Sequence, residues 1–319
     1  SRTMTYSAPP IGSCATFAVA LVMLGVIAWP GVAQQPAATQ NPSPMTETTR
    51  AHERLIQKTP LGTLRTFAGP AGKPVELLVP ARATSRGVVD LVVHFHGAAW
   101  LPEQAVAALG RNVATAVVNV GSGSGAYDRA LTDPSVFDSL LAAVTRESSA
   151  ALGAPVRLGR ITLVGFSAGH GAVRAILRQP RHFARVSAVL LLDGMHTSYV
   201  PDGTVLAAGG ALDTTNLVAF ADFARAAVRG EKRFLVTHSE IFPGTFASTT
   251  ETADWLLHAL ALRRAPVLRW GPRGMQQLSE ARAGRFELRG YAGNTAPDHI
   301  DQLHAMPELL ARLLANPDR

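Results

Sequence analysis

Ser167 lies at the centre of the pattern Gly-x-Ser-x-Gly, residues 165–169, between an apolar segment and a segment with helical spacing. A serine in this pattern between a strand and a helix can be a nucleophile, because the sharp turn exposes its hydroxyl oxygen above the sheet. The turn strains the backbone of the serine, and the two glycines remove side chains that would clash there. We therefore predict acyl transfer at Ser167, although a chain with 28 glycines can also contain this pattern by chance.

A serine hydroxyl needs a base that takes its proton, and His299 is the predicted base. It closes the segment 291–299, which leaves the last expected strand, so we expect it on a loop from which it can reach Ser167. His304 is the alternative base, and we expect it within the helix that follows this loop.

The acid that orients the base has two candidates. Asp193 directly follows the four apolar residues 189–192, and a carboxylate at that position has no obvious structural task except at the carboxyl edge of a sheet. Glu240 is the acidic residue after the next expected strand, 233–237. We predict Asp193 and retain Glu240 as the alternative, whereas Asp298, next to the predicted base, is expected to cap a loop.

Two backbone N–H groups must point at the oxygen that becomes negatively charged in the tetrahedral intermediate. Ala168, directly after the serine, is one predicted donor. The segment His96-Gly97-Ala98 closes the third expected strand, and Ala98 is the predicted second donor, with Gly97 as the alternative. We expect His96, Gly97 and Trp100 to contact the substrate, with a core position for Trp100 as the alternative.

A glycine-rich segment, residues 121–126, matches a loose G-x-G-x-x-A pattern after the fourth expected strand. A dinucleotide site requires a helix that begins at the end of such a loop. The next helix is expected to begin only near Pro134, so we predict a flexible loop beside the mouth of the active site. Tyr127, directly after this loop, is expected to contact the substrate.

Several histidines are expected at the ends of strands, which admits a metal site as an alternative. They are His94, His96, His170, His196, His238 and His299. They are not accompanied by an H-E-x-x-H pattern or by a paired spacing on a helix, so we predict no metal and no cofactor. We expect polar lining of the site instead, with His170 among the residues that contact the substrate.

Alternating strand and helix patterns run from residue 61 to the C-terminus and are expected to position these side chains. The expected strands are 62–67, 75–79, 88–94, 115–120, 161–165, 188–192, 233–237 and 285–291. The expected helices are 103–109, 135–152, 169–179, 214–229, 250–263 and 301–315. Short apolar strands separated by helices predict an α/β fold, with a mostly parallel eight-stranded sheet and helices on both of its faces.

The close pair of strands at the start, the alternation after it and the elbow on the fifth strand resemble the α/β-hydrolase superfamily from residue 61 onward. The resemblance implies a serine esterase or lipase-like enzyme, with nucleophile, acid and histidine in that order along the chain. Ser167, Asp193 and His299 follow this order, and the turn after the third strand is similar to the His-Gly oxyanion motif of these hydrolases. The commoner position of the acid in the superfamily, however, is that of Glu240.

Composition limits the class of partner. The chain has 319 residues, 47% of them hydrophobic, and a net charge of +7 whose basic residues are scattered. We therefore expect a sizeable core and no nucleic-acid partner. The lone Cys14 lies near the N-terminus, so the catalytic domain cannot use a cysteine nucleophile, a disulfide or a cysteine-bound metal.

The N-terminal segment is typical of a targeting signal. Residues 11–29 are uncharged and mostly apolar, and Gly31-Val32-Ala33 offers the small residues that signal peptidase recognises. We predict a signal peptide over 1–33, a flexible linker over 34–60 and a catalytic domain over 61–319. An uncleaved membrane anchor is the alternative, and membrane contact is expected through this segment alone.

These predictions combine into one hypothesis, an exported (secreted or periplasmic) serine hydrolase that cleaves a carboxylic ester through an acyl-enzyme on Ser167. The expected substrate is a small or polymeric ester. An amidase or peptidase with the same residues is one alternative, because a triad of this kind serves every acyl transfer. A non-catalytic binding protein that keeps the fold is the other alternative.

Overall fold

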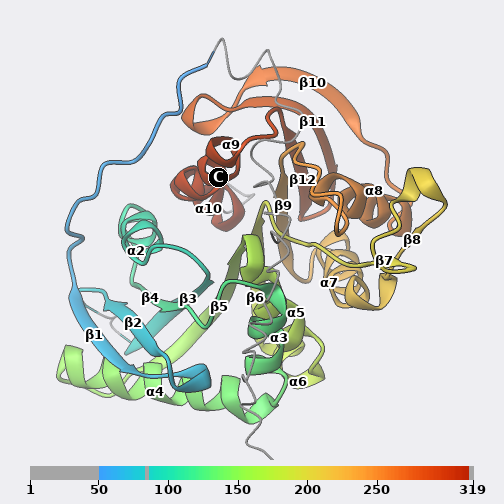
Figure 1. Cartoon of the computed structure of the whole chain (residues 1–319). Helices are drawn as coiled ribbons and strands as arrows, with labels where there is room; N and C mark the ends of the chain where they lie inside the picture. The colour runs from blue at the N-terminus through green and yellow to red at the C-terminus, as the bar shows by residue number, and fades with distance from the viewer. Residues whose placement is uncertain (1–49, 83–85, 316–319) are drawn as a thin grey trace, which may run out of the picture. The chain divides into compact units, whose positions relative to one another are not determined.

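The computed structural model describes residues 50–82 and 86–315 (Figure 1). The predicted signal peptide 1–33, Cys14 within it and the linker as far as residue 49 lie outside the described residues. Within the described ranges, no helix combines the length and the apolar character that crossing a membrane requires.

A ten-stranded sheet forms the centre of the described chain, with the strand order β1-β2-β4-β3-β5-β6-β9-β12-β11-β10. Neighbouring strands from β4 to β12 are parallel, and the strand pairs at both edges are antiparallel. The strands are β1 (Thr63–Ala68), β2 (Pro74–Val79), β3 (Val88–Phe95), β4 (Val113–Val118), β5 (Arg157–Phe166), β6 (Val186–Leu192), β9 (Arg233–His238), β10 (Ala265–Trp270), β11 (Gln276–Ala283) and β12 (Phe286–Tyr291). A separate short ribbon pairs β7 (Tyr199–Val200) with β8 (Ala211–Leu212).

Helices connect the parallel strands and cover the sheet on both faces (Figure 1). They are α2 (Trp100–Ala107), α3 (Ser124–Leu131), α4 (Pro134–Leu152), α5 (His170–Leu177), α6 (Pro180–Arg185), α7 (Val218–Val228), α8 (Thr249–Ala259), α9 (Ala296–His304) and α10 (Met306–Leu314). Helices α3, α4, α5, α7 and α8 pack on one face, and α2 and α10 pack on the other.

Alternate residues of the strands belong to two separate core layers, one on each face of the sheet. In β5, Leu163 belongs to the layer under α4 and α5, whereas its neighbour Val164 belongs to the layer under α2 and α10. Successive side chains of a strand point to opposite faces, so a sheet buried on both sides needs apolar residues at nearly every position. The short continuous apolar segments of the sequence meet this requirement, and the predicted α/β-hydrolase fold is confirmed.

Two strands of the ten-stranded sheet and the short ribbon of β7 and β8 were not predicted. Strands β10 and β11 form an antiparallel extension of the sheet next to β12. Their residues are largely polar or exposed, because β10 is an edge strand and β11 buries only alternate positions. Antiparallel strands with one solvated face lack the continuous apolar signal by which the other strands were recognised.

Helix α3 and the end of the chain also differ from the predictions. A helix begins at Ser124, so the segment 121–126 is only partly a loop. The single helix expected over 301–315 is two helices, α9 and α10, separated at Ala305. A proline at the first turn is compatible with a helix, which explains why α9 begins before the predicted start.

Candidate active site

The turn that contains Ser167 leads from β5 directly into α5. Ser167 has a φ of +49°, a left-handed conformation that residues with a side chain rarely adopt. A Cβ on Gly165 would come within 3.0 Å of the His170 amide nitrogen, and one on Gly169 within 2.1 Å of the Phe95 carbonyl oxygen. Gly165 therefore leaves room for the backbone at the start of α5, Gly169 lets the elbow pack against β3, and Ser167 is strained at the apex of the elbow.

Gly194 makes a third close approach to the elbow, one that no sequence pattern indicated. A Cβ at this position would come within 2.6 Å of the Ser167 carbonyl oxygen. The residue before it, Asp193, directly follows β6 and has a φ of +43°. The segment after β6 therefore turns sharply beside the elbow, and this turn carries the Asp193 carboxylate into the same region.

Asp193 accepts hydrogen bonds from both sides of its carboxylate. Its Oδ2 atom lies 2.7 Å from Nδ1 of His299 and 2.7 Å from the hydroxyl of Ser239. Its Oδ1 atom lies 2.8 Å from the backbone nitrogen of Ser239 and 2.7 Å from the hydroxyl of Thr249. The residue is 2% exposed, so protein groups rather than water satisfy its oxygens.

These contacts keep the Asp193 carboxyl in its charged form. Burial alone would raise its pKa, but the hydrogen bonds from His299 and Ser239 and the charge of His299 hold the pKa below its usual range. An ionised carboxylate accepts hydrogen bonds only, so the Nδ1 atom of His299 must carry a proton. In a neutral imidazole with its proton on Nδ1, the Nε2 atom carries no proton and can accept one.

His299 lies in the first turn of α9, and the expectation that it lies on a loop is wrong. Thr295 and Asp298 form a capping box that starts this helix, so Asp298 caps a helix rather than a loop. The His299 ring stacks on Phe166, with the ring centroids 4.7 Å apart and the planes inclined at 29°. Phe166 directly precedes Ser167, so the imidazole lies beside the elbow while Asp193 holds its other side.

The alternative base and the alternative acid have other partners. The Nδ1 atom of His304 accepts a hydrogen bond from the backbone N–H of Leu55 at 2.9 Å. An oxygen of Glu240 accepts a hydrogen bond from the backbone N–H of Gly293 at 3.0 Å, in the turn that precedes α9. His304 therefore holds the segment before β1, and Glu240 holds the connection between β12 and α9.

The turn after β3 makes the Ala98 N–H available rather than that of Gly97. Gly97 donates its N–H to Oδ1 of Asn119 at 3.0 Å, and its carbonyl oxygen accepts a hydrogen bond from Nδ2 of Asn119 at 2.9 Å. Within residues 50–82 and 86–315, the Ala98 N–H makes no hydrogen bond, and Ala98 is exposed. Asn119, which the sequence did not indicate as a site residue, thus fixes the turn. It also accepts the hydrogen bond of the Gly97 N–H, which was the alternative oxyanion donor.

His96 and Tyr127 support this turn. His96 has a φ of +75°, and its Nδ1 atom lies 2.9 Å from the Tyr127 hydroxyl. Burial, and then the charge of His299, lower the pKa of His96. Tyr127 is fully buried in α3, and burial raises the pKa of its hydroxyl to about 12. The prediction that Tyr127 contacts substrate does not fit this placement, because its side chain is enclosed and orients His96.

A cavity of about 530 Å³ opens beside Ser167. Its lining residues are Ser122, Gly123, Ser124, Gly125, Ser167, Ala168, His170, Arg174, His196, Thr197, Ser198, Asn216 and Phe246. Of the residues predicted to contact substrate, His170 lines this cavity, whereas His96, Gly97 and Trp100 do not. Trp100 instead packs against the core layer under α2 and α10, so it has the core position that was its alternative prediction.

His170 and His196 form a neutral wall of the cavity. The two ring nitrogens of His170 lie 2.8 Å from the Ser167 carbonyl oxygen and 3.1 Å from the His196 carbonyl oxygen. Burial, and then the neighbouring His196, lower the pKa of His170 to about 3, so the ring is neutral and donates a hydrogen bond to only one of these two oxygens. Burial also lowers the pKa of His196. The pair therefore ties the elbow to the loop after β6 without adding charge to the cavity.

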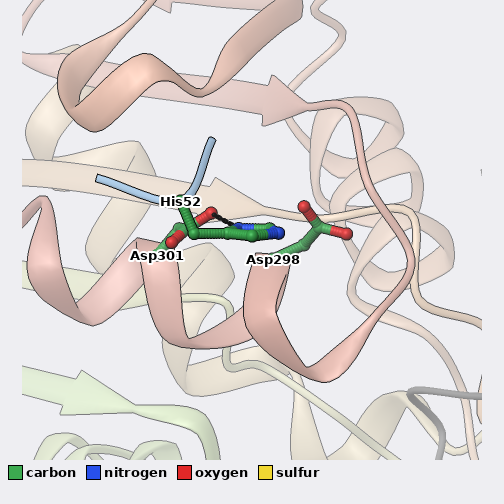
Figure 2. A group of neighbouring side chains, drawn as sticks. All are labelled: His52, Asp298 and Asp301. Carbon is green, nitrogen blue, oxygen red and sulfur yellow. Dashed lines mark hydrogen bonds and ion pairs between the residues drawn. The ribbon is translucent and has the colours of Figure 1, made fainter. Parts of the chain in front are cut away.

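A second group of titratable side chains lies at α9. Figure 2 shows His52, Asp298 and Asp301, whose potential ligand atoms lie within 4.8 Å of one another. Arg50 forms ion pairs with both carboxylates, and Arg54 forms one with Asp301 at 3.2 Å. Because two guanidinium groups already neutralise these carboxylates, the group does not fit a metal ion and instead pins the segment before β1 to α9.

The chain was compared with known proteins. No protein-family model and no curated protein matches it. An esterase from Pyrobaculum calidifontis is a similar solved structure, with 14% identity, a TM-score of 0.44 and coverage of 80% of this chain and 85% of that one. A feruloyl esterase module from Clostridium thermocellum has 12% identity, a TM-score of 0.45 and coverage of 83% and 98%.

A siderophore hydrolase from Aspergillus nidulans is similar at 12% identity and a TM-score of 0.45, over 82% of this chain and 99% of that one. Strand order and two core layers define the fold of this chain. The side chains around Ser167 define the chemistry that the cavity can support.

Proposed function

We propose that this chain is a serine hydrolase that cleaves a carboxylic ester through an acyl-enzyme on Ser167. The observation that carries the proposal is the contact between His299 and Asp193, 2.7 Å long, made by an imidazole that also stacks on the residue before Ser167. A strained serine, a histidine with an open Nε2 atom and a buried carboxylate are the groups that nucleophilic acyl transfer requires.

In the proposed reaction, the hydroxyl oxygen of Ser167 attacks the ester carbonyl while Nε2 of His299 takes the hydroxyl proton. Asp193 stabilises the imidazolium, and the N–H groups of Ala168 and Ala98 bind the oxyanion of the tetrahedral intermediate. The intermediate collapses, the C–O bond to the alcohol breaks, and His299 returns the proton to the leaving alkoxide. Water then attacks the acyl-enzyme by the same path and releases the carboxylic acid.

A turnover assay tests this proposal. Wild type and the Ser167→Ala variant are compared on 4-nitrophenyl acetate and on 4-nitroacetanilide, the matching amide. We expect hydrolysis of the ester by wild type and a loss of several orders of magnitude in kcat for Ser167→Ala. The Ser139→Ala variant is the matched control, because Ser139 is exposed on α4 and does not line the cavity, and its kcat should stay within about threefold of wild type. Full ester turnover by Ser167→Ala would exclude the proposal, and preferential amide turnover would replace ester by amide as the substrate class.

We extend the proposal to an exported enzyme, on the basis of the apolar segment 11–29 and the small residues that follow it. The test is the N-terminus of the protein isolated from a culture, read by intact-mass spectrometry. Loss of about the first 33 residues supports export through a cleaved signal, and retention of the segment in a membrane fraction favours the anchor.

A further inference from the structure

Arg174 is a buried cation in the wall of the cavity beside Ser167. Its side chain is 8% exposed. The described residues that line the cavity include no aspartate or glutamate, and burial lowers the pKa of both lining histidines, His170 and His196. Arg174 therefore sets the charge of the cavity at neutral pH, and that charge is positive.

Only one edge of the Arg174 guanidinium forms a hydrogen bond with another described residue, Asp128. Its Nε atom donates to Oδ2 of Asp128 at 2.6 Å, while its Nη1 and Nη2 atoms make no hydrogen bond to another described residue. Arg178 lies 3.3 Å from the same Asp128 oxygen. One carboxylate is thus shared between two arginines, so a net positive charge and two donor groups of Arg174 remain for another anion.

Helix α5 sets the spacing between this cation and the nucleophile. Arg174 follows His170 by four residues, so both side chains lie on one face of the helix. His170 in turn contacts the Ser167 carbonyl oxygen. The guanidinium therefore lies one to two helical turns from the elbow, which is roughly 5–10 Å along the helix axis.

Asn216 and Thr197 are polar residues of the cavity lining, and hydrogen bonds hold them in position. Asn216 donates to the Thr197 hydroxyl at 3.3 Å and to Asp213 at 3.0 Å. Its own oxygen accepts a hydrogen bond from Arg178 at 3.2 Å. This hydrogen-bond network keeps Asn216 and Thr197 in position, so the space beside Arg174 is preorganised for a ligand.

We propose that the cavity receives an acyl group that ends in a carboxylate, which pairs with Arg174 while the scissile carbonyl lies at Ser167. The corresponding substrates are half-esters of short dicarboxylic acids, and hydrolysis with one water releases the dicarboxylate and an alcohol. This inference rests on the proposed function of Ser167. The planar fork of an arginine suits a carboxylate, and a low local dielectric strengthens the pair.

The first test compares mono(4-nitrophenyl) adipate, pimelate and suberate with the uncharged 4-nitrophenyl esters of the same chain length. Wild type should have a kcat/KM at least tenfold higher for one of the half-esters than for its uncharged counterpart. Rates without enzyme are subtracted for each ester. Equal kcat/KM values for charged and uncharged members of every pair would overturn the inference.

Two substitutions locate the effect. Arg174→Gln should lower kcat/KM for the preferred half-ester about 10- to 100-fold and change that for the uncharged ester by less than about threefold. Arg174→Lys should retain part of the preference, because it keeps the charge without the fork. Arg181→Gln is the matched control, since Arg181 is an exposed arginine that forms an ion pair with Asp138 and does not line the cavity, and it should keep the preference. A preference that survives Arg174→Gln would contradict the role of Arg174.

A binding measurement separates this inference from the proposed function. Adipate, pimelate and suberate are titrated calorimetrically into Ser167→Ala and into Ser167→Ala combined with Arg174→Gln. Binding of one dicarboxylate that weakens at least tenfold in the double variant supports the anion site, whether or not the wild type turns over esters. Ester turnover that depends on Ser167, together with no dicarboxylate binding, would overturn the anion site and leave the proposed function standing.

Discussion

The Nδ1 atom of His299 lies 2.7 Å from Oδ2 of Asp193, although 106 positions separate the two residues in the chain. Asp193 directly follows β6, and His299 lies in the first turn of α9, which follows β12. The parallel strands β6, β9 and β12 are neighbours in the sheet, so their carboxyl ends meet at one edge. This edge also receives the elbow after β5, and the contact therefore orients the imidazole beside Ser167.

We predict that Asp193→Asn lowers kcat about 10³- to 10⁴-fold on 4-nitrophenyl acetate. An amide in place of the carboxylate can donate to Nδ1, which places the imidazole proton on Nε2 and removes the base. Glu240→Gln is the control, because Glu240 binds the backbone of Gly293, and its kcat should stay within about threefold of wild type. Circular dichroism checks that both variants fold. A large loss in Glu240→Gln with none in Asp193→Asn would reverse the assignment of the acid.

Asn119 is predicted to act on the oxyanion through the turn that it holds. Asn119→Ala removes both hydrogen bonds to Gly97, so the Ala98 N–H loses its fixed direction. We expect kcat/KM to fall about 10- to 100-fold. The affinity for a trifluoromethyl ketone, whose adduct with Ser167 carries an oxyanion, should fall by a similar factor. An unchanged inhibitor affinity in a folded Asn119→Ala protein would show that this turn does not bind the oxyanion.

The buried His238 is predicted to destabilise the fold as the pH falls. Burial, and then the nearby charge of Arg264, lower its pKa to about 4, and Arg264 lies 2.7 Å from its Nε2 atom. In the unfolded chain the pKa is about 6.5. The stability contributed by neutral His238 is thus fully present above pH 6.5 and is lost as the pH falls toward 4. The slope is about 1.4 kcal/mol per pH unit for one proton.

Urea unfolding between pH 7 and pH 5 measures this effect. The free energy of unfolding should depend less steeply on pH in His238→Gln than in wild type, by about one proton. His94 and His170 are also fully buried with lowered pKa values, so wild type and variant should both retain a residual slope in the same direction. Identical slopes for the two proteins would mean that His238 takes up its proton in the folded state.

Much of the fold could be predicted, because strands that are buried on both faces must be apolar along their whole length. Strands β10 and β11 escaped this criterion, since β10 is an exposed edge strand and β11 buries only alternate residues. Helix α9 was predicted to begin too late because the segment 291–299 was taken as a loop that leaves the last strand, although the proline in this segment is well suited to a first helical turn. The capping box formed by Thr295 and Asp298 is the signal that could have corrected this.

Three residues of the candidate site could be proposed from the sequence alone. Residues whose contacts depend on the fold could not. Ser167, Asp193 and His299 follow from residue type and position along the chain. Asn119 binds Gly97 from a different strand end, and nothing in its local sequence indicates that partner. Arg174 resembles any helical surface arginine in the sequence, and only its burial in the cavity wall distinguishes it.

Locating the adduct of a fluorophosphonate is the most direct test of nucleophilic attack by Ser167. The reagent is incubated with wild type, Ser167→Ala and Ser198→Ala, and tryptic peptides are mapped by mass spectrometry. We expect one adduct in wild type and in Ser198→Ala, on Ser167 within the peptide 161–174, and none in Ser167→Ala. An adduct on a different serine, or equal labelling of Ser167→Ala and wild type, would contradict nucleophilic attack by Ser167.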